Sequence, residues 1–332
     1  MKEMLKTLCE AYGATGHEGC VANVIRGMIE PYVDEIRTDA LGNLIAVKRG
    51  GGKRVMLAAH MDHIGFVVTD IDEDGYLRVH SVGGIRKLNS LHRRVVFESG
   101  MSGVVAAEAR EHDLAADNTL QKVFIDIGAK DRASAETLVK RGDVAVYAPD
   151  VFDVGEDCLA GPAMDDRAGC ALLVGALEQL KESPHEIVAV FTSQEEVGLR
   201  GARAAAYDID PDVGIALDVT LTGDTPKGPL MSVKVGAGIA VKVMDSSLIC
   251  HPGVVRRLEQ AAERGGIAYQ REVLTAGGTD AGAIQLTRGG VPAGVLSIPC
   301  RYVHSATEMI SLKDLQAGVD LLCAYLGADE LV

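Results

Sequence analysis

Hydrophobic positions near the N-terminus first recur with helical spacing and then form short extended runs. Apolar residues three or four positions apart predict a helix over residues 17–30. The following runs predict strands over residues 33–37, 44–47 and 55–59, and the first two are joined by a turn that contains Gly42. The third strand ends at His60. This succession of a helix and apolar strands is typical of an α/β layer.

The hydrophobic pattern of the sequence changes over residues 66–150. Short runs rich in Val, Ile, Phe and Tyr, such as FVVTDI and DVAVYAP, are mostly separated by Gly, Asp or Asn, and only residues 133–140 predict a helix. We interpret residues 66–156 as a small β-rich domain inserted into an α/β domain made of residues 1–65 and 157–332. The alternative is that these strands continue the main sheet.

The α/β pattern returns in the last half of the chain. Asp165 and Asp166 precede a predicted helix and suit its positive N-terminal end. Helices are expected over residues 168–180, 252–264, 279–286 and 312–326, and strands over residues 187–191, 213–217 and 294–298 and at Val273. Strands that alternate with helices predict a mostly parallel sheet sandwiched by helices.

Composition and charge narrow the class of protein. The chain has 332 residues, 47% of them hydrophobic and 24% charged, which is typical of a globular protein with one large and one smaller domain. A formal charge of −14 without a basic patch argues against a nucleic-acid partner. No run approaches the roughly 20 apolar residues that span a membrane. Seven scattered cysteines without a CxxC pair, and no secretory signal, favour a reduced cytoplasmic protein.

Residues of the metal-ligand type follow several of the buried runs. They are His60, Asp62, Glu195, Glu196, Asp218 and His304. Functional groups in an open α/β sheet gather beyond the carboxyl ends of the strands, so we expect these residues to share one crevice. Asp165, at the start of a helix that leaves the same edge, can join them.

Imidazoles and carboxylates without thiolates form a set of ligands that suits Zn, Co or Mn. Two such ions about 3.5–4 Å apart can share a hydroxide and polarise a carbonyl, which indicates metal-assisted hydrolysis. Each residue also has a purely structural interpretation. A lone His after a strand can be a hydrogen-bonding residue, adjacent glutamates can form a solvated edge, and Asp165 with Asp166 can cap a helix.

Six motifs carry a family resemblance. AHMDHIG (59–65), GPAMDDRAGC (161–170), SQEEVGLRGA (193–202), ALDVT (216–220), GGTDAG (277–282) and RYVHS (301–305) resemble the two-metal aminopeptidases of the glutamyl and deblocking type, which include the tetrahedral aminopeptidases. The motifs occur in the family's order, and the resemblance covers nearly the whole chain. It implies a zinc-exopeptidase-like fold and two divalent ions per subunit, Zn or Co.

The resemblance also implies a role for each matching residue. Asp165 bridges both metals, His60 and Asp218 complete one site, and Glu196 and His304 complete the other. Asp62 orients the imidazole of His60. Glu195 is the general base that deprotonates the metal-bridging water, the nucleophile, and later protonates the departing amine.

Several positions have no assigned role. The family often has Glu where this chain has His63, and we assign His63 no function. Thr279 and Asp280 are expected near the substrate or, alternatively, at a helix N-terminus. Arg301 and Tyr302 precede His304 and are expected to brace it.

The resulting hypothesis is a metal-dependent aminopeptidase that removes N-terminal residues from peptides. By analogy with the family, residues 66–156 drive self-association, from dimers to a twelve-subunit shell that admits unfolded peptides. The alternative is a two-metal amidohydrolase that deacylates N-acyl substrates. A glycanase is disfavoured because it needs paired acids flanking a sugar bond. A non-enzymatic shell is disfavoured because Glu195 and all five ligand positions are present. The sequence leaves the preferred first residue and the native metal open.

Overall fold

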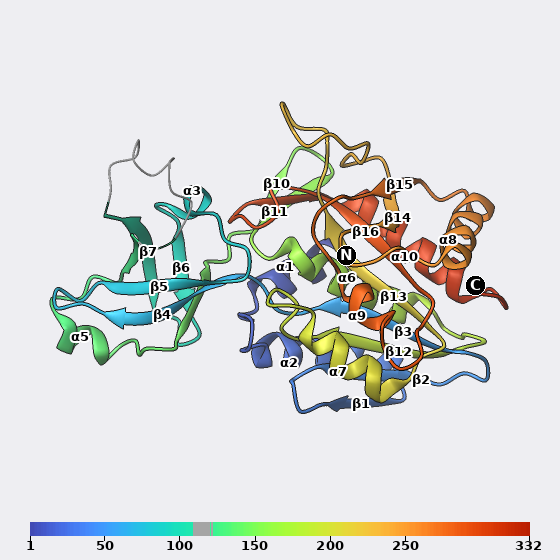
Figure 1. The fold of residues 1–332 in the computed structure, drawn as a ribbon, viewed down its shortest axis with the longest axis horizontal. Helices are drawn as coiled ribbons and strands as arrows, with labels where there is room; N and C mark the ends of the chain where they lie inside the picture. Colours follow the sequence, from blue (N-terminus) through green and yellow to red (C-terminus); the bar gives the residue numbers. More distant parts are fainter. Residues whose placement is uncertain (109–119, 121) are drawn as a thin grey trace.

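A large twisted sheet forms the centre of the computed structural model, which describes residues 1–108, 120 and 122–332 (Figure 1). Its order is β1-β2-β12-β3-β13-β16-β17-β11-β10, and β14 and β15 are attached beside β16. The strands are β1 (Glu35–Thr38), β2 (Leu44–Lys48), β3 (Arg54–His60), β10 (Phe152–Val154), β11 (Cys158–Gly161), β12 (Glu186–Thr192), β13 (Val213–Thr220), β14 (Ile239–Met244), β15 (Tyr269–Val273), β16 (Ala293–Arg301) and β17 (Glu308–Ser311).

The predicted α/β class is confirmed, with parallel pairing concentrated at the centre of the sheet. β12, β3, β13 and β16 are parallel neighbours, as are β14 and β15. The pairs β1–β2, β10–β11 and β16–β17 are antiparallel. Short connections join the strands of these pairs, and parallel pairing would need a long crossover instead.

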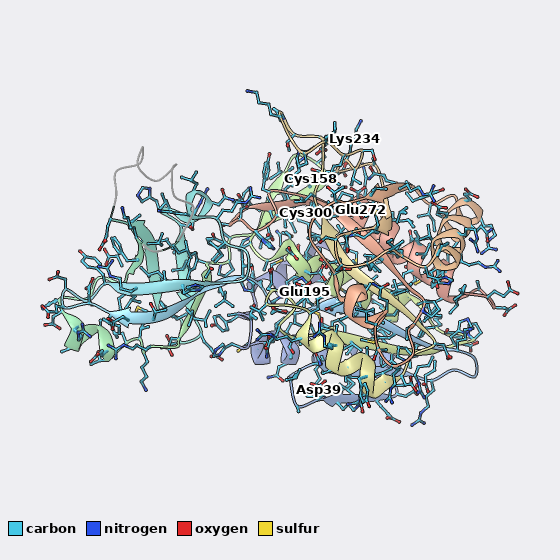
Figure 2. All side chains as sticks on the ribbon, in the orientation of Figure 1. Asp39, Cys158, Glu195, Lys234, Glu272 and Cys300 are labelled. Atoms are coloured by element: carbon cyan, nitrogen blue, oxygen red, sulfur yellow. The ribbon has the colours of Figure 1, made fainter. Side chains whose placement is uncertain are left out.

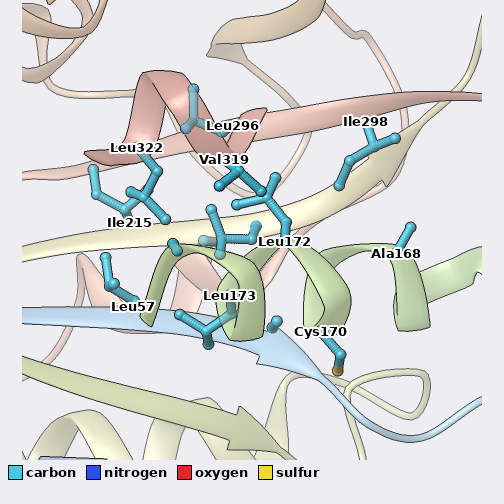
Figure 3. Close-up of a cluster of buried hydrophobic side chains, with 14 of the residues drawn as sticks. Leu57, Ala168, Cys170, Leu172, Leu173, Ile215, Leu296, Ile298, Val319 and Leu322 are labelled. Atoms are coloured by element: carbon cyan, nitrogen blue, oxygen red, sulfur yellow. The ribbon is translucent and has the colours of Figure 1, made fainter. Parts of the chain in front are cut away.

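Helices cover both faces of the sheet because its central strands are apolar on both sides. Val55, Leu57 and Ala59 of β3 face one apolar cluster, and Met56 and Ala58 face another. The first face carries α1 (Lys2–Glu10), α2 (Gly19–Ile29), α6 (Met164–Gln179), α8 (Pro252–Gly265) and α10 (Leu312–Leu326), and the second carries α7 (Arg200–Ile209) and α9 (Asp280–Ile284). Figure 3 shows the centre of the first cluster, where α6 packs between the strands and α10.

Several elements differ from the predicted ones. Strands β10, β11, β14 and β17 and helices α1 and α7 were not predicted, and a one-turn 3-10 helix (Glu30–Tyr32) follows α2. The buried positions of α7 are mainly alanine and glycine, whose small side chains bury little apolar surface even though they recur with helical spacing. Helix α9 is shorter than the predicted 279–286. No helix among the described residues is long and apolar enough to span a membrane.

The β-rich segment forms a closed barrel beside the large sheet (Figure 1). Its strands, in barrel order, are β4 (Gly65–Ile71), β5 (Leu77–Val82), β8 (Val123–Asp126), β7 (Ser102–Ala107), β6 (Arg94–Phe97) and β9 (Val144–Tyr147). The barrel has its own apolar core, in which the rings of Phe66 and Tyr147 meet edge to face at 5.7 Å. This separate core is the reason the strands do not continue the main sheet.

Two short helices accompany the barrel, α3 (Lys87–Ser90) and α5 (Arg132–Glu136). The helix predicted over residues 133–140 is therefore only five residues long, and Asp131 caps it by accepting a hydrogen bond from the Ser134 amide. Residues 109–119 and 121, within the predicted insert, lie outside the described residues. After the barrel, β10 already belongs to the large sheet.

Candidate metal centre

The predicted ligand residues come together at the carboxyl edge of the parallel strands. His60 ends β3, Asp218 lies in β13, and Glu195 and Glu196 follow β12. Asp165 lies in the first turn of α6, and His304 lies in the loop between β16 and β17. Figure 2 shows Glu195 in the middle of the molecule, near the junction between the barrel and the α/β part. One edge of one sheet therefore collects side chains that are up to 244 positions apart in the chain, from 60 to 304.

The Asp165 carboxylate lies between two imidazoles. Its Oδ1 is 3.0 Å from Nε2 of His60, and its Oδ2 is 3.4 Å from Nε2 of His304. His304 Nε2 is also 3.3 Å from Oε2 of Glu196. Although burial opposes ionisation, hydrogen bonds from the two imidazoles hold the pKa of Asp165 below its ordinary value. One carboxylate thus offers an oxygen to each imidazole.

Two further carboxylates lie near the same ring nitrogen of His60. His60 Nε2 is 3.9 Å from Oδ1 of Asp218 and 4.0 Å from Oε2 of Glu195. Burial, reinforced by neighbouring carboxylates, raises the pKa of Glu195 and of Asp218 well above the ordinary value. The site therefore concentrates carboxyl groups whose charged forms a bound cation would stabilise.

Asp62 connects His60 to the loop that carries the two glutamates. The main-chain oxygen of Asp62 is 2.9 Å from His60 Nδ1, and its carboxylate Oδ1 is 3.6 Å away. The carboxylate accepts hydrogen bonds from the amides of Glu195 (2.9 Å) and Glu196 (3.2 Å) and from the Thr15 hydroxyl (2.8 Å). Asp62 is therefore placed both to fix the ring of His60 and to hold the position of Glu195.

Two groups that were not predicted from the sequence hold His304. Glu308 is buried, and its two carboxylate oxygens accept hydrogen bonds from the amides of Asp165 (3.0 Å) and His304 (2.7 Å). The main-chain oxygen of Gly84, in the barrel segment, is 3.0 Å from His304 Nδ1. A Cβ at position 84 would lie 2.5 Å from that nitrogen, so a side chain here would displace the imidazole. An acid four residues after a candidate ligand was the only signal for Glu308.

The donor set fits divalent metal ions. Among the described residues, Oε1 of Glu196 is buried without a hydrogen-bond partner. This is expected of an oxygen atom that is available to coordinate a metal ion. Oxygen and nitrogen donors of His60, Asp165 and Glu196 lie within 4.8 Å of one another, as do those of His60, Asp166 and Asp218. Both oxygens of Asp166 already accept main-chain amides, from His60 (3.2 Å) and Gly169 (2.9 Å). Asp165 is therefore the better bridging ligand of the two.

The candidate ligands open into a cavity of about 530 Å³. The cavity is also lined by Val219, Leu274, the glycines at 277 and 278, and the buried Lys242. Lys242 Nζ lies 3.3 Å from Asp245 and 3.2 Å from Glu272. Burial opposes the charge, but these two acids raise the pKa of Lys242, so its charge is balanced inside the wall.

The remaining predicted positions have varied surroundings. Burial lowers the pKa of His63 to about 3, so His63 is neutral at pH 7. His63 is also not a member of either group of candidate metal ligands among the described residues. Thr279 is the N-cap of α9 and lines the cavity, and buried Asp280 accepts a hydrogen bond from Thr192 (2.5 Å). Arg301 forms an ion pair with Asp224, as expected of a brace, whereas Tyr302 is 57% exposed.

Comparison with other proteins gives the same family over nearly the whole chain. A protein of Acetivibrio thermocellus is 48% identical over 322 residues, which are 97% of each chain. The lysyl aminopeptidase of Pyrococcus furiosus is 35% identical over 336 residues, covering 98% of this chain and 96% of the relative.

Solved structures share the whole fold. An aminopeptidase of the archaeon Desulfurococcus kamchatkensis superposes with a TM-score of 0.94 at 36% identity, covering 98% of this chain and 94% of the other. The TET1 peptidase of Pyrococcus horikoshii, which assembles into a tetrahedron or a large octahedral shell, has a TM-score of 0.86 at 33% identity over 98% of both chains. The family model for M42 glutamyl aminopeptidases matches residues 42–321. The chain therefore belongs to the M42 glutamyl aminopeptidase family and is a peptide hydrolase, an aminopeptidase of a metallopeptidase family.

Proposed function

We propose that this chain removes N-terminal residues from peptides with two divalent ions, Zn or Co, and with Glu195 as the general base. The observation that carries the proposal is the Asp165 carboxylate, which offers one oxygen toward His60 and the other toward His304. Asp165 would bridge the ions, with His60 and Asp218 completing one site and Glu196 and His304 the other.

Bound divalent ions would make a water molecule more acidic and polarise the scissile carbonyl. The protein's own contribution is to hold and move the proton. Glu195 lies 4.0 Å from His60 Nε2, and the Asp62 carboxylate fixes its amide. Glu195 would accept the proton of the attacking water and then donate it to the departing amine. A buried environment favours the return of the proton because it stabilises the neutral acid.

An acidic cavity also suits the free terminal ammonium of a peptide. Glu195, Glu196 and Asp218 all line the cavity. Acetylation of the amine removes the charge that these carboxylates would attract. The proposal therefore favours a free N-terminus over an N-acyl substrate.

We further propose that the barrel, which makes up most of the predicted insert 66–156, is an inserted assembly domain and that the chain self-associates, from dimers to a twelve-subunit shell. Support comes from the barrel's separate core and from large apolar side chains exposed on this segment, Leu88 at 58%, Val104 at 45% and Leu138 at 45%. The native mass measured by light scattering tests this: a monomer at micromolar concentration would refute it.

The catalytic proposal is tested with aminoacyl-p-nitroanilides beside their N-acetylated forms. We expect the free amines to be hydrolysed, the activity to disappear with a chelator, and Zn or Co to restore it. Elemental analysis should give two ions per chain. Faster cleavage of the N-acetylated forms, or turnover that survives complete metal removal, would refute the proposal.

A further inference from the structure

A second cavity continues from the first one. It measures about 420 Å³ and shares Arg86, Leu221 and Val303 with the cavity of the metal centre. Arg93, Arg301 and Thr307 also line it. The first cavity is lined by the candidate ligands and by Lys242, whereas none of the candidate ligands lines the second cavity, which adjoins the first at the shared residues.

Three arginines line this second cavity. The side chains of Arg86 and Arg93 are exposed and have no ion pair or side-chain hydrogen bond within the part of the chain that the structure describes. Arg301, on the same wall, is already held by Asp224, with Nε 3.0 Å from Oδ1. Arg86 and Arg93 thus bring positive charge to this cavity in a protein of formal charge −14. Exposed arginines can therefore bind an anion without first breaking an internal pair.

Both arginines come from the barrel segment. Arg86 immediately precedes α3, and Arg93 immediately precedes β6. The barrel segment also supplies the Gly84 oxygen beside His304. One stretch of the insert thus contacts a candidate ligand and, a few residues later, presents positive charge along the exit from the cavity.

We propose that the second cavity binds the part of the peptide that follows the scissile bond, and that Arg86 and Arg93 bind its terminal carboxylate when the peptide is short. This inference rests on the proposed function. An exopeptidase needs a closed space for one side chain and an open path for the rest of the chain. Two residues beyond the scissile bond span about 7 Å when extended, and Arg86, which lines both cavities, is the arginine that the carboxylate of a tripeptide would meet first. Guanidinium groups bind carboxylates with paired hydrogen bonds.

The test compares X-Gly-Gly with its C-terminal amide, where X is the residue hydrolysed fastest as its p-nitroanilide. We expect the free acid to have the lower KM in the parent protein. Arg86→Gln and Arg93→Gln should each raise the KM of the free acid about three- to fivefold, the range of a solvent-exposed ion pair. The KM of the amide should stay unchanged, and the double variant should remove the difference. Hydrolysis of X-p-nitroanilide, which lacks the carboxylate, should be unaffected.

Arg94→Gln is the matched control, because Arg94 is an exposed neighbour in β6 that does not line the cavity. Equal KM values for the acid and the amide in the parent, or an Arg94→Gln effect as large as that of Arg86→Gln, would overturn the inference. Loss of turnover on every substrate would refute the proposed function instead. Calorimetric titration of the two peptides would then test carboxylate binding in the second cavity separately. Equal affinities for the acid and the amide would exclude a carboxylate site.

Discussion

The two imidazoles of the candidate centre are held in opposite ways. His60 is 2% exposed, ends a central strand, and has its Nδ1 beside the main-chain oxygen of Asp62, two residues away. His304 has a side chain that is 32% exposed and a left-handed backbone with φ of 61°, and its Nδ1 partner is Gly84, 220 residues away. The first imidazole is positioned by its own strand. The second depends on contacts from other parts of the chain.

This difference has an energetic reason. A left-handed conformation costs a residue other than glycine roughly 1–2 kcal/mol, so other contacts must hold His304 in place. Glu308 holds its amide and Gly84 holds its ring. We therefore distinguish a strand-held half of the centre, His60 and Asp218, from a loop-held half, Glu196 and His304. The loop-held half should be the more easily disturbed.

The largest effect is expected at Glu195, the proposed general base. Glu195→Gln should lower kcat by about 10²- to 10⁴-fold, the usual contribution of a general base. Glutamine keeps the size of the side chain but cannot accept the proton. Metal content should not change, because Glu195 is not one of the proposed ligands. Turnover of an aminoacyl-p-nitroanilide and elemental analysis check both points. Glu73→Gln, an exposed acid on the barrel, is the control. Activity within tenfold of the parent would remove Glu195 from this role.

The comparison becomes sharper when each imidazole is removed in turn. His304→Ala should leave one ion per chain, and the remaining ion should be the one that a chelator removes slowly from the parent. His60→Ala should also lose an ion, but it should leave the one that dissociates rapidly. Each affinity should fall at least about tenfold. The measurement is metal release followed with a chromophoric chelator. Full occupancy in His304→Ala would contradict its assignment as a ligand.

A smaller effect should follow from loosening the loop-held half without removing a ligand. Glu308→Gln replaces one of two acceptor oxygens with an NH₂ group that would face an amide donor, so metal affinity should fall about tenfold. Asp314→Asn is the matched control, because buried Asp314 accepts the amides of Gly236 (2.6 Å) and Gly238 (2.7 Å) away from the site. Both variants should lose stability. An equal loss of metal affinity in both would show that Glu308 acts only on the fold.

The smallest effect concerns the brace of the His304 loop. A hydrogen bond from Arg301 lowers the pKa of Asp224 to about 2, so the pair stabilises the fold when the carboxylate is charged. Its contribution is complete above the unfolded value near 3.8 and is lost as the pH falls toward 2. Asp224→Asn should cost about 1 kcal/mol at pH 7, because the pair is partly exposed to solvent. Urea unfolding at pH 7 and pH 3 measures it, and an equal cost at both would contradict this account.

Much of the strand-held half could be predicted from the sequence. The apolar runs that become β3, β12, β13 and β16 are local patterns, and each has ligand-type residues at or after its carboxyl end. Because the carboxyl ends of parallel strands meet at one edge, the local pattern was enough to predict that the six residues and Asp165 converge. The small β-rich unit was predictable in the same way, since its strands are short, alternating runs between turn residues.

The contacts that hold the loop-held half, and the residues that line the approach to the cavity, were decided by tertiary structure. Glu308, Gly84 and Arg86 have no local pattern that distinguishes them, and their partners or neighbouring wall residues lie on other segments of the fold. Hydrophobic periodicity indicates which face of a helix or strand packs against the core of its own layer. Hydrogen bonds between a barrel loop and a strand connection depend on how two separately packed cores are placed, and only the folded chain fixes that placement.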